Sequence, residues 1–246
     1  MSARALRLDS LCTWQRTSGA PSFSRDAKSC TSTPSKESFR MASLAYERLQ
    51  ESLAAKMSLY ESANASLPNE SDEMSRLDSA ILLDAWSLVD VLNRLRVLVD
   101  LMPGLKKSSP GVKSFLYSLG PIEDLRNAVQ HLCGQVHKIA DTGHPVWGSL
   151  SWAAPPVEPG DALKAAAFVP GTLARVKGIP VVNPVGRQCE SPVGLIELTA
   201  AGRTVSLSEM MAAVLRFADR LERAAKAAFA DSPEEASDIV FNVDAS

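Results

Sequence analysis

The residues of this chain best suited to chemistry lie close together, within residues 123–131. This segment contains Arg126, then Asn127 directly after it, and His131 five positions after the arginine. Around them, apolar residues recur at alternating steps of three and four: Ile122, Leu125, Val129, Leu132, Val136 and Ile139. This spacing predicts one apolar seam of an amphipathic helix. At about 100° per residue, Asn127 and His131 project nearly opposite the seam, so we expect them on a polar face.

These residue types are suited to work on a phosphodiester. A histidine titrates in the range that acid/base catalysis requires. An arginine can bind two phosphate oxygens at once and stabilise charge in the transition state. Cleavage of RNA without a metal needs a base for the 2′-hydroxyl and an acid for the leaving 5′-oxygen. Since one helix supplies only one histidine on this face, two copies of the chain across a two-fold axis would complete the site.

Further polar residues on the same helix are candidates for binding the substrate. Glu123 and Gln130 share the side of His131, and His137 lies on the flank occupied by Arg126. The alternative for the whole set is a solvated helix face without a function. The chain shows no glycine-rich phosphate loop, no Ser-His-Asp order and no metal-ligand motif. We therefore expect neither a metal nor a cofactor.

Two further helices are expected before this one. Residues 41–64 carry apolar residues at helical spacing: Leu44, Leu49, Leu53, Met57 and Tyr60. Residues 72–102 predict a long helix that begins at a Ser71 or Asp72 cap. The seam of this long helix comprises Leu77, Ile81, Leu88, Leu92, Leu95 and Val99. A second apolar patch on its far side comprises Leu83, Trp86, Val97 and Leu101. A helix that is apolar on two sides is central in its domain or contributes to an oligomer interface.

The remaining elements complete a mainly α fold. A short helix over 112–119 precedes Pro121, which is suited to the first position of the motif helix; we expect that helix to run to about Ala140. After it the chain is rich in proline and in short β-prone runs: 146–153, 166–169, 173–182, 194–199 and 204–207. Ser206 and Glu209 predict a capping box that opens the last helix. We therefore expect a helical bundle of about four helices with a small antiparallel β module inserted before the last helix.

Composition separates the chain into three parts. Residues 1–40 are rich in serine and threonine and lack a periodic apolar face, so we predict a disordered N-terminal extension, with Met41 as an alternative start. A targeting peptide is the other interpretation of such a basic, serine-rich segment. Residues 41–230 form the helical domain, with the β-rich insertion at about 145–205, and residues 231–246 form an acidic tail.

The bulk composition narrows the classes of function. The net charge of −2 gives no global signal for nucleic-acid binding, so any RNA would be bound by a local patch. No apolar run is long enough and free enough of charge to span a membrane. The four cysteines have neither metal-ligand nor redox spacing. We expect a cytoplasmic protein with reduced thiols and no membrane partner.

The pattern Arg126-Asn127-x-x-x-His131 resembles the signature of the HEPN superfamily, in which an arginine is followed after four to six residues by a histidine. The setting is similar too: a long helix, a turn, and the motif on a later helix of an α-bundle, over residues 72–140. The resemblance implies a phosphate-contacting role for Arg126, an acid/base role for His131 and an orienting role for Asn127. It also implies a metal-independent ribonuclease that acts as a homodimer, in a toxin–antitoxin or phage-defence system.

Other functions remain open beside this one. The same bundle could be a non-catalytic interaction module whose polar face binds a protein partner, such as an antitoxin, or a nucleic acid. The motif could also be accidental in a structural protein. Trp147 and Trp152 are expected in the core, although one of them could stack on a base. Lys106 and Lys107 could contact an RNA backbone.

Overall fold

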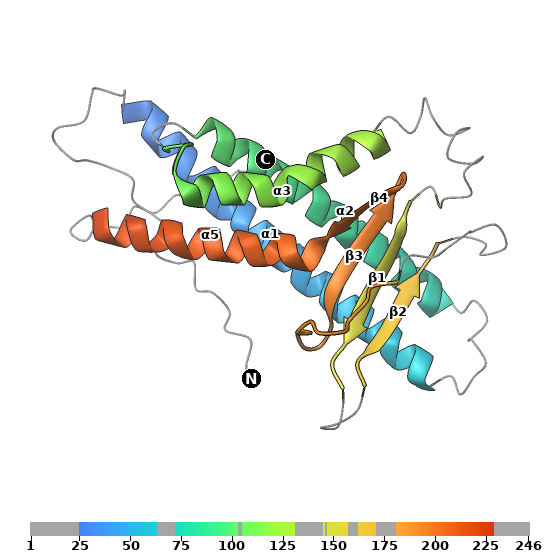
Figure 1. The fold of residues 1–246 in the computed structure, drawn as a ribbon. Coiled ribbons are helices and arrows are strands. Elements are labelled where there is room, and N and C mark those ends of the chain that lie inside the picture. Colours follow the sequence, from blue (N-terminus) through green and yellow to red (C-terminus); the bar gives the residue numbers. More distant parts are fainter. Residues whose placement is uncertain are drawn as a thin grey trace, which may run out of the picture.

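A bundle of long helices packs against one face of a small antiparallel sheet (Figure 1). The computed structural model describes residues 25–62, 72–102, 105–130, 145, 147–156, 162–170 and 181–228. Its helices are α1 (Arg25–Ser62), α2 (Asp72–Leu101), α3 (Pro110–Gln130) and α5 (Leu207–Ala228). Its strands are β1 (Ser149–Ala154), β2 (Lys164–Phe168), β3 (Gly194–Ala200) and β4 (Arg203–Ser206). This confirms the predicted mainly α fold with a β module before the last helix.

The centre of the bundle is the antiparallel pair of α1 and α2 (Figure 1). Most of the predicted α2 seam is fully buried: Ile81, Leu88, Leu92, Leu95 and Val99. On the opposite side of α2, the side chains of Leu83, Val97 and Leu101 are 62%, 39% and 70% exposed. These three members of the second apolar patch are therefore surface residues, whereas its fourth member, Trp86, is partly buried and packs against the core.

The N-terminal boundary differs from the prediction, because α1 begins at Arg25 and not at Met41. Phe39 is only 2% exposed, and its ring centroid lies 6.5 Å from that of Phe217 in α5. The buried face of α1 also includes Ala42, Tyr46, Leu49 and Leu53, whereas Leu44 is 57% exposed. The predicted helix start at Met41 is therefore wrong, because the buried face of α1 already includes Phe39. Residues 1–24 and the acidic tail lie outside the described residues.

A second correction concerns α3, which is one continuous helix through Pro121 and not two helices. A proline inside a helix removes one backbone hydrogen bond and disfavours helical geometry in the residue before it. Here the preceding residue is Gly120, which has no Cβ to clash, and the carbonyl left without a partner belongs to Tyr117, whose side chain is 87% exposed. The buried residues Leu119 and Ile122 continue one apolar face across the proline.

The sheet has the strand order β2-β1-β3-β4, and all its pairs are antiparallel. The turn between β3 and β4 contains Ala201 and Gly202 with φ of 50° and 74°, as a tight hairpin requires. Four of the five predicted β-prone runs correspond to these strands. The fifth, 173–182, lies mostly outside the described residues, and its described end at 181–182 is not in a strand.

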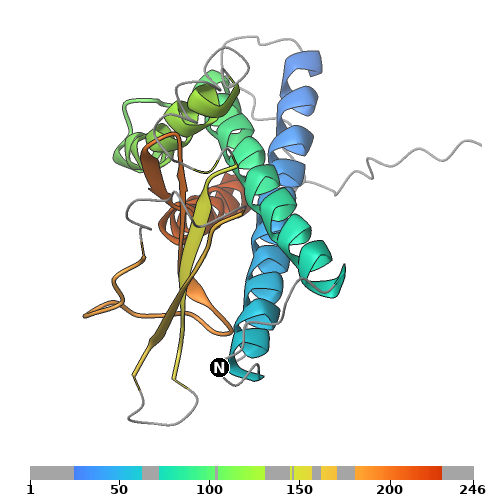
Figure 2. The ribbon, with the colours of Figure 1, turned by 90° about the vertical axis from the view of Figure 1, so that its right-hand side faces the viewer.

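Both faces of β1 are covered. Leu150 and Trp152 face the bundle core and are fully buried, while Ala153 packs with Val182 and Leu195 on the other side. Figure 2 shows α1 and α2 on one side of the sheet, with the segment of residues 181–193 projecting from the other. Within the described residues, no helix combines the length and apolar character needed to cross a membrane.

Candidate functional site

The polar face of α3 lies where α3 packs beside α2. Ile122 and Leu125 are fully buried, whereas Glu123, Asn127 and Gln130 are exposed. The predicted orientation of the amphipathic helix is therefore confirmed up to Gln130, its last described residue.

Two of the predicted site residues cannot be placed on this face. His131 and His137 lie outside the described residues, as does the predicted continuation of the helix to Ala140. His131 follows Gln130 directly in the sequence.

Arg126 is held by two partners. Its Nε donates a hydrogen bond to Asp90 Oδ1 of α2 at 2.7 Å, and its Nη1 donates to Gln130 Oε1 at 3.1 Å, one turn further along α3. The side chains of Arg126 and Asp90 are 29% and 49% exposed, so the ion pair faces solvent. Charge-assisted bonds of this kind fix the orientation of the planar guanidinium.

The same guanidinium retains unused hydrogen-bonding capacity. An arginine side chain has five N–H donors, and the bonds to Asp90 and Gln130 use two of them. The other three have no hydrogen-bond partner among the described residues. Arg126 can therefore bind an anion through these donors while Asp90 continues to hold its Nε.

The acidic residues beside Arg126 are themselves neutralised. Glu123 forms an ion pair with Arg96 of α2, and Asp124 Oδ2 accepts from Arg203 Nη1 of β4 at 2.8 Å. Glu123 was predicted to contact the substrate, but in this structure it bridges α3 to α2. The Asp124–Arg203 ion pair joins α3 to β4 at the edge of the sheet. The two ion pairs together hold α3 in place around Arg126.

Aromatic residues lie on the same side of α2. Trp86 precedes Asp90 by about one helical turn, and its Nε1 donates to the backbone carbonyl of Trp147 at 3.2 Å. Trp147 is 58% exposed, whereas Trp152 is fully buried. The expectation of two core tryptophans is therefore wrong for Trp147. This residue lies before β1, so it is outside the strand geometry that directs Trp152 into the core.

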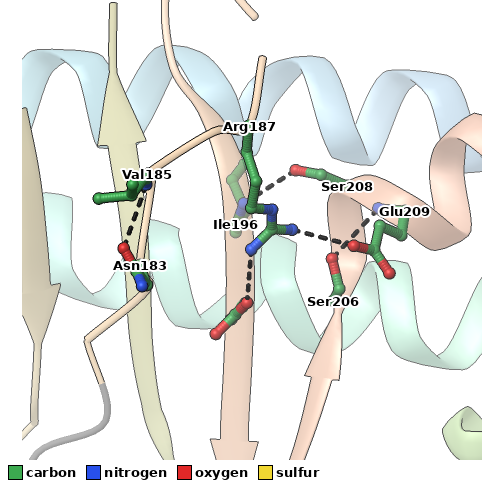
Figure 3. Close-up of polar contacts among 8 residues, drawn as sticks. Asn183, Val185, Arg187, Ile196, Ser206, Ser208 and Glu209 are labelled. Carbon is green, nitrogen blue, oxygen red and sulfur yellow. Dashed lines mark hydrogen bonds and ion pairs between the residues drawn. The ribbon is translucent and has the colours of Figure 1, made fainter. Parts of the chain in front are cut away.

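Sequence reasoning missed a second polar cluster, which joins the segment 181–193 to the sheet and α5 (Figure 3). Arg187 bonds to Glu197 Oε1 of β3 at 3.3 Å and to Glu209 Oε1 of α5 at 2.9 Å. Ser206 Oγ accepts from the backbone N–H of Glu209 at 3.3 Å, which is one half of the predicted capping box. The Glu209 carboxylate binds Arg187.

A buried tyrosine of α1 joins this helix to α5 and β3. The Tyr46 hydroxyl lies 2.8 Å from Ser208 Oγ, which in turn accepts from the backbone N–H of Ile196 at 2.8 Å. Burial raises the pKa of Tyr46 above its ordinary value, with further contributions from the nearby Glu190 carboxylate. Such a hydroxyl stays protonated at neutral pH, so Tyr46 joins these elements by hydrogen bonding and is not suited to act as a base. No local sequence signal could reveal it, because its members are far apart in the chain.

A buried lysine forms a third polar cluster, at the far end of α1. Lys56 is 2% exposed and forms an ion pair with Asp78 of α2. Its Nζ also lies 4.2 Å from the ring centroid of Phe168 and 5.5 Å from that of Tyr60. An ammonium group in this position is enclosed by its partners, so we assign it to packing between α1, α2 and β2.

The function has to be inferred without a metal site among the described residues and without a matching known protein. The described part of the chain contains no group of three or more histidine, cysteine, aspartate or glutamate side chains that could hold a metal ion. No protein-family model, no curated protein and no solved structure matches the chain. The functional argument therefore depends on the geometry around Arg126.

Proposed function

We propose that this protein is a metal-independent ribonuclease that cleaves RNA through Arg126 and His131. The observation that carries the proposal is the arginine, which lies on a solvent-facing helix surface with Asp90 holding its Nε. Three of its donors have no partner among the described residues, so they are available to a phosphate. An oriented, accessible guanidinium supports phosphate binding because it needs little rearrangement to accept two oxygens.

In the proposed reaction, Arg126 binds the non-bridging oxygens of the scissile phosphate. A base removes the proton of the 2′-hydroxyl, the 2′-oxygen attacks phosphorus, and the P–O5′ bond breaks as an acid protonates the leaving oxygen. The products are a 2′,3′-cyclic phosphate and a 5′-hydroxyl. His131 of one copy acts as the base and His131 of a second copy acts as the acid, while exposed Asn127 orients the substrate.

The experiment that tests the role of Arg126 is cleavage of a labelled RNA in EDTA by matched variants. Arg126→Ala should lower the cleavage rate by about 10²–10³, the usual effect of removing one group that stabilises transition-state charge. Arg126→Lys should recover little of it, since an ammonium cannot bind two oxygens in the same planar geometry. Arg223→Ala is the control, because Arg223 is 70% exposed and lies on α5. Equal rates for Arg126→Ala and Arg223→Ala would contradict the proposal.

The second candidate function is a non-catalytic interaction module. It is favoured by the ion pairs at and around Arg126, in which Asp90, Glu123 and Asp124 each pair with an arginine. A protein partner with its own charged groups could exchange for these solvent-facing ion pairs. Under this alternative the protein binds its partner but never cleaves RNA. Under the first, it acts as a toxin or phage-defence nuclease controlled by an antitoxin.

A further inference from the structure

The exposed face of α2 is continuous and contains both apolar and charged side chains. At about 100° per residue, the members of this face lie within about 60° of one line along the helix: Leu83, Trp86, Asp90, Arg94, Val97 and Leu101. Leu83 and Leu101 are 62% and 70% exposed. Arg94 is exposed and forms no ion pair with a described residue. Large exposed leucines beside an unused arginine indicate a surface that is covered in the working protein.

This face is complementary to itself when two copies of α2 run antiparallel. A two-fold axis at the level of residue 92 brings together positions equally far from it along the helix. Leu83 and Leu101 are each nine residues away from that level, and Asp90 and Arg94 are each two residues away. The axis therefore places Leu83 against the partner's Leu101 and Asp90 against the partner's Arg94.

A third pair follows from the same axis. Trp86 and Val97 are six and five residues from the level of residue 92, and both lie on the side of the face that borders α3. The axis brings Trp86 against the partner's Val97, with an offset of about 1.5 Å, the rise of one residue. One arrangement therefore gives the apolar, aromatic and charged residues of this face a matching residue on the partner. An interface around a two-fold axis requires such a self-complementary surface.

We propose that two copies of this chain form a homodimer through the antiparallel packing of α2 on α2 in this register. The pairing is inferred from the exposed face of α2 alone. Its catalytic consequence, however, rests on the proposed function, which needs two copies of the site.

The pairing would bring the two candidate sites together. Asp90, which holds Arg126, lies only two residues from the axis, or about 3 Å along α2. Because α3 borders the same side of the face in both copies, the two α3 helices come to lie on one side of the α2 pair. The two Arg126 side chains then flank the axis, where a single phosphodiester could meet residues of both copies.

The test is the molar mass of the full-length protein by light scattering over a dilution series from about 50 μM to about 50 nM, which gives the Kd of the dimer. Wild type should be a dimer. Leu83→Glu and Leu101→Lys should each weaken the dimer at least tenfold, because each buries a charge against a leucine. The double variant Leu83→Glu/Leu101→Lys should recover the dimer, since each glutamate then faces a lysine of the partner. Tyr117→Glu, at an 87% exposed position of α3, is the matched control and should remain dimeric.

The register has its own control. A mixture of Leu83→Glu with Leu83→Lys protein should remain monomeric, because position 83 does not face itself in the proposed pairing. A monomeric wild type, single variants as dimeric as wild type, or recovery in this mixture but not in the double variant would overturn the proposal. The masses are measured without RNA, so the pairing is tested apart from the nuclease. A dimer that does not cleave RNA would contradict the nuclease but not the pairing. A monomer that cleaves RNA would contradict the pairing and the two-copy site, but not the role of Arg126.

Discussion

Arg126 and Lys56 show two different ways in which this fold holds a cation. Arg126 shares a solvent-facing ion pair with Asp90, whereas Lys56 is enclosed by Asp78 and two aromatic rings. A solvent-facing pair contributes up to about 1 kcal/mol, and here it leaves three donors of Arg126 without a partner among the described residues. A buried pair is costly to break, because the charge left behind has no water around it. The first arrangement suits binding and the second suits stability.

The buried lysine gives a prediction at the level of one ion pair. Asp78→Asn should lower the free energy of unfolding by about 3 kcal/mol, because it leaves the Lys56 ammonium buried without a counter-charge. Lys56→Met should cost less than about 1 kcal/mol, since a methionine fits between the rings and Asp78 is 31% exposed and can be hydrated. Urea unfolding at pH 7 measures both. A larger loss for Lys56→Met than for Asp78→Asn would contradict this assignment of Lys56.

Tyr60 gives a prediction for alkaline pH. Burial, together with the nearby Asp78 carboxylate, raises the pKa of Tyr60 from 10.0 to about 12. Between these values the unfolded chain loses the proton and the folded protein keeps it, so folding becomes less favourable as the pH rises. The contribution is fully present below pH 10 and is lost as the pH passes 12. The free energy of unfolding should therefore fall more steeply from pH 10 to 12 for wild type than for Tyr60→Phe. Parallel curves for the two proteins would argue against a raised pKa.

Among the elements, α1 and α3 are the helices whose bounds differ from those that the sequence pattern predicts. The predicted start of α1 at Met41 depended on leucines at helical spacing, but Leu44 is exposed and the buried seam already includes Phe39. The helix break predicted at Pro121 ignored the apolar face that continues from Leu119 to Ile122. In both cases tertiary burial outweighed a local signal.

The corrected start of α1 predicts the result of shortening the chain. A protein that begins at Met41 loses Phe39 and its packing on Phe217. Phe39→Ala should lower the free energy of unfolding by about 3–5 kcal/mol, as for other buried phenylalanines, and removal of residues 1–40 should cost at least as much. Leu44→Ala is the control, with a loss under about 1 kcal/mol, because Leu44 is 57% exposed. Thermal unfolding of the three proteins checks this. A shortened protein as stable as wild type would show that Phe39 contributes nothing.

At the scale of the whole molecule, the sequence predicts the fold better than the site. The α2 seam, the polar face of α3 and the β3–β4 hairpin follow from periodicity and turn chemistry, which act between residues close in the chain. Periodicity and turn chemistry do not predict the partners of Arg126 or the cluster around Arg187. These contacts join elements that only the packed fold brings together. The Arg126–Asp90 bond links two helices whose relative register no local pattern specifies.

The proposed reaction requires Arg126 and His131 to cleave RNA without a metal. The most direct measurement is the nature of the RNA ends formed by the full-length protein in EDTA, compared with His131→Ala. Wild type should leave 2′,3′-cyclic phosphate ends, and His131→Ala should form them about 10²–10⁴ times more slowly, the usual loss for one acid/base group, with an unchanged melting temperature. A wild-type protein that never cleaves RNA, or a folded His131→Ala protein that cleaves as fast as wild type, would contradict the claim.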